Sequence, residues 1–166
     1  MEEPMLYQLA EQVGLALKAR GLMLTTAESC TGGWIAAAIT AVPGSSTWFE
    51  RGFVTYTYIS KREMLDVQSD TLSAYGAVSE PTVREMAMGA LAHSHAQVAV
   101  AVSGTAGPSG GTADKPVGTV CLAWAMAGEQ PESETRHFEG TRDAVRRESV
   151  IYALSGVLDR VTRQKK

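Results

Sequence analysis

The 166-residue sequence has little cysteine and no long apolar run. It contains only Cys30 and Cys121, which are too few to form the disulfide framework of a small secreted domain. No segment approaches the roughly 18 consecutive apolar residues that a membrane-crossing helix needs. The opening residues, MEEPMLYQ, lack the basic region and apolar run of a signal peptide. We therefore expect a cytoplasmic protein with reduced cysteines and no membrane contact.

The sequence also lacks an excess of positive charge. Fifteen Lys and Arg residues face 18 Asp and Glu residues, giving a net charge of −3, which argues against nucleic acid as the main partner. No Walker loop, G-x-G-x-x-G fingerprint, C-x-x-C or H-E-x-x-H pattern occurs, so we expect neither metal nor cofactor. There is no internal repeat or linker either, and residues 1–166 are predicted to form one domain.

The sequence pattern predicts ten elements, in the order helix, strand, helix, strand, helix, helix, strand, strand, strand, helix. Residues 97–103 are apolar enough for a central strand, whereas 133–140 are typical of an edge strand. This order predicts an α/β fold, with helices on both faces of a mixed central sheet. Helices are predicted at 6–21, 34–42, 60–67, 79–95 and 141–161, and strands at 22–27, 51–58, 97–103, 118–126 and 133–140.

The junction after the first predicted strand is unusually rich in nucleophiles. It reads Glu28-Ser29-Cys30-Thr31-Gly32-Gly33. A hydroxyl at a helix N-terminus can attack a substrate, and the unpaired amides there can hold the resulting oxyanion. An ordinary N-cap serine followed by a glycine turn explains the same residues. Cys30 is either a rival nucleophile or a small buried side chain.

Two further junctions carry polar residues that could bind a ligand. The loop SGTAGPSGGTADKPVG, residues 103–118, carries Gly104, Gly107, Gly110 and Gly111 before its last residue. Such loops hold phosphates or expose amides; an ordinary surface connection is the alternative. Arg142 lies in the first turn of the last predicted helix, where the helix dipole disfavours a cation. Arg146 shares its face, so the pair could bind a phosphate or carboxylate, or could simply face solvent.

Lys61 is the best candidate for a general base. His93 and His95 end a predicted helix and His137 lies in the weak edge strand, so none has a suitable place. A lysine that loses hydration in a pocket has a lower pKa and can accept a hydroxyl proton. Lys61 follows a predicted strand and could reach the same edge of the sheet as Ser29, although most lysines in such positions face solvent.

Several segments together resemble the CinA C-terminal domain family, which includes nicotinamide mononucleotide deamidases. They span residues 5 to 160, and AESCTGG is the most specific of them. The resemblance implies a three-layer α/β/α sandwich that hydrolyses the carboxamide of nicotinamide mononucleotide to the acid and ammonia, and it implies a homodimer. The segments are TTAESCTGG, GSSTWFERGFVTY with Lys61 after it, GAVSEPTV, SGTAGPSGG, KPVGTV and GTRDAVRR.

The resemblance also assigns roles to individual residues. It places the nucleophile at Ser29, the base at Lys61 and an accompanying tyrosine at Tyr56, and it puts Arg142 within range of the substrate phosphate. The expected substrate-binding residues are Cys30, Thr31, Gly32, Gly33, Tyr58, Gly104, Thr105, Gly107, Gly110 and Arg142.

The chain departs from the usual family pattern around these residues. Tyr58 replaces an asparagine, Thr105 and Ser109 stand where isoleucine and aspartate are usual, and Thr141 replaces an aspartate. Two alternatives to a serine–lysine amidohydrolase therefore stay open. One is a diverged paralogue that binds a nucleotide or phosphate ligand without turnover, and the other is a hydrolase that uses Cys30.

Overall fold

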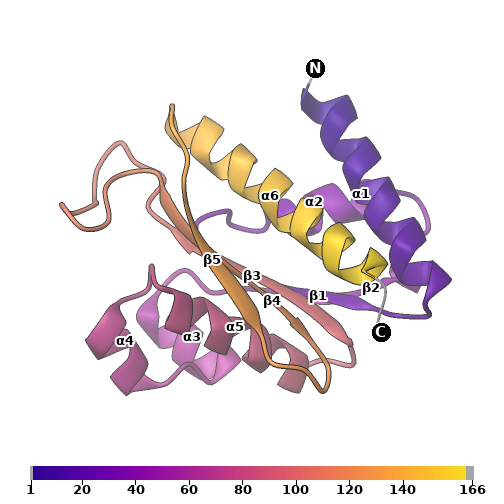
Figure 1. Cartoon of the computed structure of the whole chain (residues 1–166), viewed down its shortest axis with the longest axis horizontal. Helices are drawn as coiled ribbons and strands as arrows, with labels where there is room; N and C mark the ends of the chain where they lie inside the picture. Colours follow the sequence, from indigo (N-terminus) through magenta and orange to yellow (C-terminus); the bar gives the residue numbers. More distant parts are fainter. Residues whose placement is uncertain (1, 164–166) are drawn as a thin grey trace.

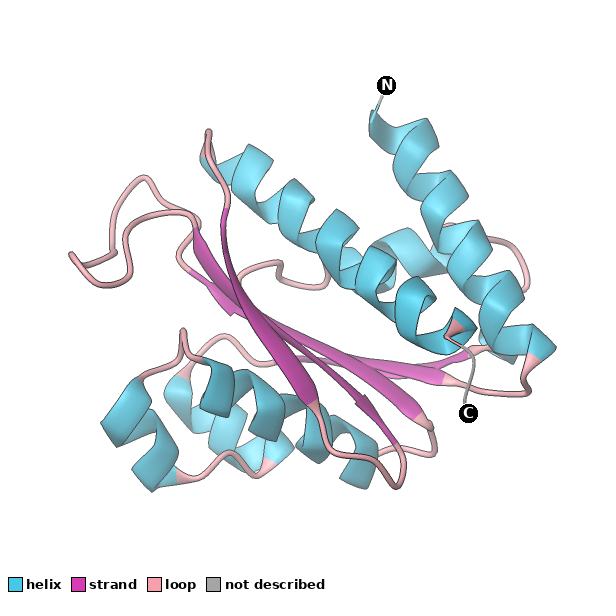
Figure 2. Cartoon of the chain, in the orientation of Figure 1, coloured by secondary structure: helices cyan, strands magenta, loops and turns pink. Residues whose placement is uncertain are grey.

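In a computed structural model, which describes residues 2–163, a five-stranded sheet lies between two layers of helices (Figures 1 and 2). The strand order is β2-β1-β3-β4-β5. β1 pairs in parallel with β2 and β3, whereas β4 is antiparallel to both β3 and β5. The predicted α/β sandwich with a mixed sheet is confirmed. The strands are β1 (Leu24–Glu28), β2 (Phe49–Val54), β3 (Val98–Gly104), β4 (Thr119–Met126) and β5 (Glu132–His137).

The helices divide into two groups, one on each face of the sheet. In Figure 1, α1, α2 and α6 lie above the sheet and α3, α4 and α5 lie below it. Each group closes its own apolar core, because alternate residues of β3, such as Val100 and Ala101, point to opposite faces. The helices are α1 (Glu2–Ala19), α2 (Trp34–Thr40), α3 (Tyr58–Leu65), α4 (Ser69–Tyr75), α5 (Glu80–Ala92) and α6 (Arg142–Thr162), with a 3₁₀ turn at Ser45–Thr47.

Two predictions about local structure were wrong in detail. The strand predicted over 51–58 ends at Val54, because Thr57 caps the helix that follows. The Thr57 hydroxyl accepts from the Ser60 amide at 3.1 Å, and the Ser60 hydroxyl accepts from the Thr57 amide at 3.0 Å. This capping box starts α3 two residues before the predicted boundary. The second error is α4, which was not predicted.

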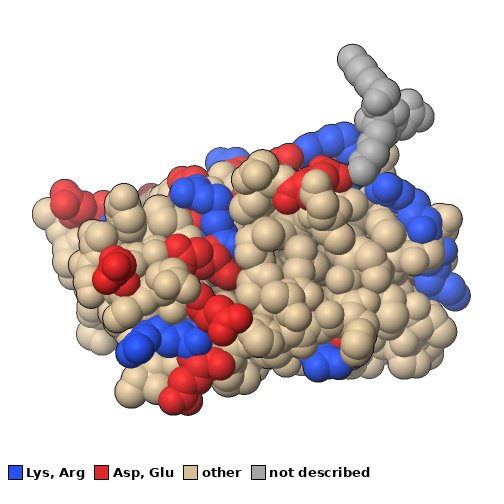
Figure 3. Space-filling model, turned by 90° about the horizontal axis from the view of Figure 1, so that it is seen from below, with Lys and Arg blue, Asp and Glu red and all other residues tan. Residues whose placement is uncertain are grey.

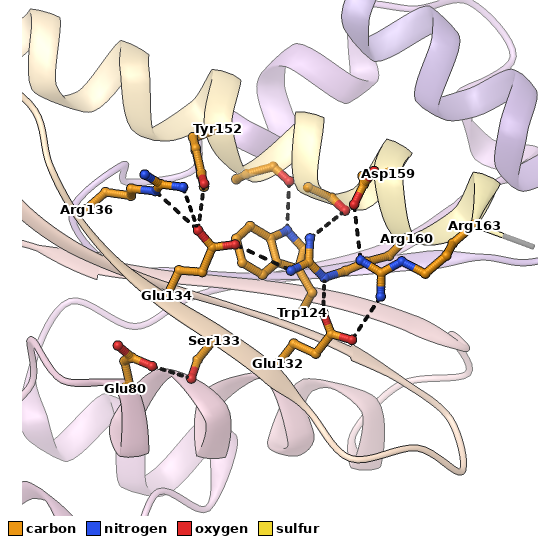
Figure 4. Close-up of polar contacts among 12 residues, drawn as sticks. Glu80, Trp124, Glu132, Ser133, Glu134, Arg136, Tyr152, Asp159, Arg160 and Arg163 are labelled. Carbon is orange, nitrogen blue, oxygen red and sulfur yellow. Dashed lines mark hydrogen bonds and ion pairs between the residues drawn. The ribbon is translucent and has the colours of Figure 1, made fainter.

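A network of charged side chains fastens edge strand β5 to α6 (Figure 4). The Arg160 guanidinium lies 3.9 Å from the centre of the Trp124 ring, and its Nε donates to Glu132 at 3.0 Å. Tyr152 donates its hydroxyl to Glu134 at 2.6 Å. Charges along an edge strand discourage pairing with other chains, so this network both anchors β5 and protects its free edge.

Gly156 lets α6 approach the sheet closely, because an added Cβ there would overlap the Trp124 indole. We predict that Gly156→Ala destabilises the fold by about 1–3 kcal/mol, the usual cost of overpacking a core. Chemical denaturation measures the change. Ser155→Ala, at the exposed neighbouring position, is the control and should alter stability by less than about 0.5 kcal/mol. Equal stability of Gly156→Ala and the wild type would contradict this packing.

The face below the sheet shows acidic and basic side chains interleaved rather than separated (Figure 3). This distribution agrees with the small net charge of −3. Among residues 2–163, no helix is long and apolar enough to cross a membrane.

Candidate active site

Ser29 and Lys61 meet at the carboxyl edge of the parallel strands, as the sequence predicts. Ser29 follows β1 directly, and its amide donates to the Val102 carbonyl of β3 at 3.0 Å. Lys61 lies in the first turns of α3, which follows β2. The Lys61 Nζ is 2.8 Å from the Ser29 Oγ, within direct reach for proton transfer.

The surroundings of Lys61 favour an uncharged amine. Its side chain is only 1 % exposed, and burial lowers the pKa of Lys61 from its ordinary 10.5 to about 8. Nζ also donates to the Thr55 carbonyl oxygen at 2.8 Å. That bond uses one N–H of the amine, so the nitrogen lone pair of the neutral form can face the Ser29 hydroxyl.

Glu28 holds the start of α2, a role that the sequence pattern did not predict. Its buried carboxylate accepts from the Thr31 hydroxyl at 2.6 Å and from the Ile35 and Ala36 amides at 2.9 and 3.0 Å. A carboxylate there also interacts favourably with the helix dipole. Ser29 is therefore not the N-cap, and its hydroxyl is left to face Lys61.

Cys30 lies beside the pair but is a poor nucleophile. Burial raises the pKa of the Cys30 thiol to about 12. The thiolate is the reactive form, so almost none is present near neutral pH. Cys30 therefore contributes to the wall of the site, and the hydrogen bond between Lys61 and Ser29 favours Ser29 over Cys30 as the nucleophile.

A cavity of about 260 Å³ opens beside the Ser29–Lys61 pair. One wall comes from the end of β1 and from the tyrosines before and at the start of α3. The facing wall is the glycine loop after β3, and Arg142 of α6 closes one side. The lining residues are Ser29, Cys30, Tyr56, Tyr58, Lys61, Ala77, Val78, Ser103, Gly104, Thr105, Ala106, Gly107, Ser109 and Arg142.

Tyr56, Tyr58 and Arg142 form the polar rim of this cavity. Arg142 donates to the Gly107 carbonyl at 2.8 Å and to the Tyr56 hydroxyl at 3.1 Å. The Tyr58 hydroxyl accepts from the Ala77 amide at 3.3 Å. Tyr56 is 60 % exposed and touches the guanidinium rather than the reacting pair, so its contacts fit the binding of a ligand better than proton transfer.

Four of the expected substrate-binding residues do not line the cavity. Thr31 is fully buried and directs its hydroxyl at Glu28. Gly32 and Gly33 adopt positive φ values of 60° and 103°, a conformation that glycine permits at little cost, so they shape the turn into α2. Gly110 lies further along the glycine loop, beyond the residues that face the pair.

Arg146 fits neither of the alternatives that the sequence left open, because it is directed at the backbone of the β1–α2 turn rather than at the cavity or at solvent. Its Nε donates to the Cys30 carbonyl at 3.1 Å, and Nη2 donates to the Thr31 carbonyl at 3.3 Å. The helical spacing placed both arginines on one face correctly but could not show what each one meets. Among residues 2–163, no group of three or more His, Cys, Asp or Glu could hold a metal ion.

Comparison with known proteins identifies the family and the names of similar proteins. The CinA C-terminal domain family matches residues 6–161. The chain is 56% identical over 154 residues to nicotinamide-nucleotide amidohydrolase PncC of Escherichia coli (strain K12), with 93% of each chain covered. It is 54% identical over 150 residues to the protein of that name from Pseudomonas putida, covering 90% of this chain and 93% of the relative.

Solved structures share the fold throughout. The competence/damage inducible protein CihA from Agrobacterium tumefaciens superposes with a TM-score of 0.91 at 45% identity, covering 95% of this chain and 96% of the other. Competence damage-inducible protein A from Klebsiella pneumoniae gives 0.92 at 41% identity, covering 96% and 99%. Fold and site together define an α/β sandwich protein with a buried serine–lysine pair at its strand ends. The chain belongs to the CinA C-terminal domain family.

Proposed function

We propose that this protein is an amidohydrolase that deamidates nicotinamide mononucleotide, releasing nicotinic acid mononucleotide and ammonia. The observation that carries the proposal is the buried 2.8 Å contact between the Ser29 hydroxyl and the Lys61 amine beside an open cavity. The names of the relatives, which cover nearly the whole chain, support the substrate. Such a reaction would return a pyridine nucleotide to salvage.

The first half of the reaction transfers the acyl group to Ser29. Neutral Lys61 takes the proton from the Ser29 Oγ, which attacks the carboxamide carbon. The negative charge that develops on the carbonyl oxygen needs nearby donors. The Cys30 amide adjoins the nucleophile. It donates to no oxygen of the described residues and interacts only with the thiol of its own side chain. The C–N bond then breaks as Lys61 returns its proton to the nitrogen, and ammonia leaves.

The second half releases the acid. A water molecule gives a proton to neutral Lys61 and attacks the ester carbon, and the proton then returns to the Ser29 Oγ as the ester bond breaks. The positively charged pyridinium ring of the substrate withdraws electrons from the carboxamide, which assists both attacks. No other reactant is required, and the enzyme ends in its starting state.

The direct test measures ammonia released by the purified protein from nicotinamide mononucleotide, with nicotinamide, nicotinamide riboside and a simple aliphatic amide alongside. The proposal predicts that the mononucleotide has the highest kcat/KM. Turnover of none of these amides, combined with a thermal shift on adding nucleotide, would instead support a paralogue that only binds its ligand.

We predict that Arg142→Met raises KM for nicotinamide mononucleotide by about 10- to 100-fold, because a hydrogen bond to a charged group is worth about 1.5–3 kcal/mol. The change in kcat should be much smaller, since the guanidinium lies at the rim. Steady-state kinetics separate the two quantities. Arg163→Met removes an exposed arginine at the far end of α6 and should change neither. A fall in kcat without a rise in KM would contradict this role for Arg142.

The homodimer, the cytoplasmic location and the absence of nucleic acid or membrane as a partner remain predictions. Light scattering of the purified protein tests the dimer.

A further inference from the structure

Arg146 lies outside the cavity, yet it contacts the backbone that carries the nucleophile. Its side chain is 28 % exposed and lies with its guanidinium 5.4 Å from the centre of the Trp34 ring. Nε donates to the Cys30 carbonyl and Nη2 to the Thr31 carbonyl, at 3.1 and 3.3 Å. Nη1 is 3.8 Å from the Asp143 carboxylate. Two of its nitrogens therefore donate to backbone carbonyls of the turn that carries the nucleophile.

Two peptide groups connect Arg146 to the amide next to the nucleophile. The carbonyl oxygen and the N–H of one trans peptide point in opposite directions. The peptide between Thr31 and Gly32 accepts at its oxygen from Arg146 at 3.3 Å and from the Trp34 amide at 3.1 Å, and its N–H donates to the Ser29 carbonyl at 3.0 Å. That carbonyl belongs to the peptide between Ser29 and Cys30, whose own N–H is the Cys30 amide. The hydrogen bonds thus run in series from the guanidinium to this amide.

We propose that Arg146 is a positioning residue that holds and polarises the Cys30 amide, the donor to the oxyanion, through these two peptide groups. The inference rests on the proposed function for its catalytic consequence. Each peptide in the series is held at its oxygen, so neither can rotate and turn its N–H away from the reacting carbonyl. Hydrogen bonds in series also polarise one another, and the series begins here at a permanent positive charge.

A second contact of Arg146 reinforces the same segment. Because Nε grips the Cys30 carbonyl, the peptides on both sides of Cys30 are restrained. Glu28 holds the Thr31 side chain from another direction through its hydroxyl. The turn between β1 and α2 is therefore held both by Arg146 of α6 and by Glu28 of β1.

The kinetic test is Arg146→Met, with Arg146→Lys as the conservative variant. Arg146→Met should lower kcat by about 10- to 100-fold, close to the cost of a misplaced or lost oxyanion donor. KM should change less than about twofold, because Arg146 does not line the cavity and an interaction made only in the transition state affects kcat alone. Arg146→Lys keeps the charge but cannot donate to two carbonyls in the same geometry. Its kcat should therefore lie between those of the wild type and Arg146→Met. Added methylguanidinium should partly restore the kcat of Arg146→Met.

Arg20→Met is the matched control. Arg20 also donates from a guanidinium to a backbone carbonyl of α6, that of Val161, at 2.9 Å. Val161 lies 15 residues after Arg146 on the same helix, about 22 Å along its axis. Arg20→Met should lower thermal stability while leaving kcat unchanged. If it lowers kcat as much as Arg146→Met does, the effect is general loosening and the inference is wrong.

A measurement without turnover separates this inference from the proposed function. In ¹⁵N NMR spectra of the whole protein, Arg146→Met should move the Gly32 and Cys30 amide protons upfield and speed their exchange, while Arg20→Met should not. These changes are expected even if no amide substrate is hydrolysed. Unchanged amide resonances, an unchanged kcat, or a raised KM with unchanged kcat in Arg146→Met would each overturn the inference.

Discussion

Ser29→Ala is expected to lower kcat for nicotinamide mononucleotide by about a thousandfold or more, because removing a nucleophile leaves only binding and oxyanion stabilisation. KM should change little, since the methyl group keeps the cavity intact. The variant should also fold normally: Ser29 is a small residue at the end of β1, and its backbone contact with Val102 survives the substitution. Ammonia release under saturating substrate measures the loss.

Cys30→Ala is the matched comparison for that result. The two residues are neighbours and both line the cavity, but the hydrogen bond of Lys61 goes to Ser29. Cys30→Ala should retain most of the turnover and lose a modest amount of stability, because it removes a buried sulfur from the core around α2. Full activity of Ser29→Ala, together with inactivity of Cys30→Ala, would assign the nucleophile to the thiol.

Lys61→Met is expected to abolish measurable turnover and also to change how stability depends on pH. General acid–base groups contribute about 100- to 10,000-fold to rate, and this amine serves both half-reactions. In the wild type, kcat/KM should rise about tenfold per pH unit below pH 8 and level off above it, because only neutral Lys61 can accept the proton. Any residual kcat/KM of Lys61→Met should no longer rise with pH in this range.

The stability effect follows from the same lowered pKa. Between pH 8 and pH 10.5 the unfolded chain carries a proton on Lys61 and the folded chain does not, so this group makes the fold more stable as pH rises. The full gain is about 3.5 kcal/mol, because the pKa falls from 10.5 to about 8 and each pKa unit corresponds to roughly 1.4 kcal/mol. Cys30, whose pKa is raised to about 12, acts in the opposite direction above pH 9, so the informative quantity is the difference between wild type and variant.

Chemical denaturation of both proteins from pH 7 to pH 10.5 measures this difference. At pH 7 the free energy of unfolding of Lys61→Met should compare most favourably with that of the wild type. This relative stability should fall as pH rises. Lys18→Met removes an exposed lysine of α1. Its free energy of unfolding should depend on pH in the same way as that of the wild type over the whole range. Parallel curves for Lys61→Met and the wild type would mean that the amine titrates as it does in water.

The meeting of Ser29 and Lys61 could be predicted from the sequence because parallel topology restricts where strand ends lie. β1 and β2 are parallel neighbours, so the segments that follow them leave the sheet at the same edge. The sequence also showed the strand-to-helix turns on which the two residues lie. What it could not show was the depth of burial that makes the amine a base, because several elements enclose Lys61 together.

The start of α3 was misjudged because local propensity and capping chemistry disagree there. Thr55 to Tyr58 are β-branched and aromatic, which favours a strand. The Thr57–Ser60 capping box outweighs that preference and turns the chain into a helix that carries Lys61 inward. The signal was present in the spacing of Thr57 and Ser60. α4 offers a weaker signal, since Leu72 is its only buried residue.

The roles of Glu28 and Arg146 depend on distances that sequence spacing does not define. Glu28 reaches amides seven and eight residues ahead, and Arg146 reaches carbonyls more than a hundred residues earlier. Helical periodicity could place Arg146 on a face of α6, but only the packing of that helix against the β1–α2 turn shows what it contacts. In the structure the two arginines therefore have different surroundings. Arg142 lines the cavity, whereas Arg146 contacts the backbone just after the nucleophile.

Trapping the acyl-enzyme tests the central claim, that the Ser29 hydroxyl attacks with Lys61 as its base, most directly. The wild type is mixed with nicotinamide mononucleotide, quenched with acid during turnover, digested and examined by mass spectrometry. We predict an ester-linked nicotinoyl mononucleotide on Ser29, absent from Ser29→Ala and strongly reduced in Lys61→Met. An adduct on Cys30 instead, or turnover that persists in Ser29→Ala, would contradict the account.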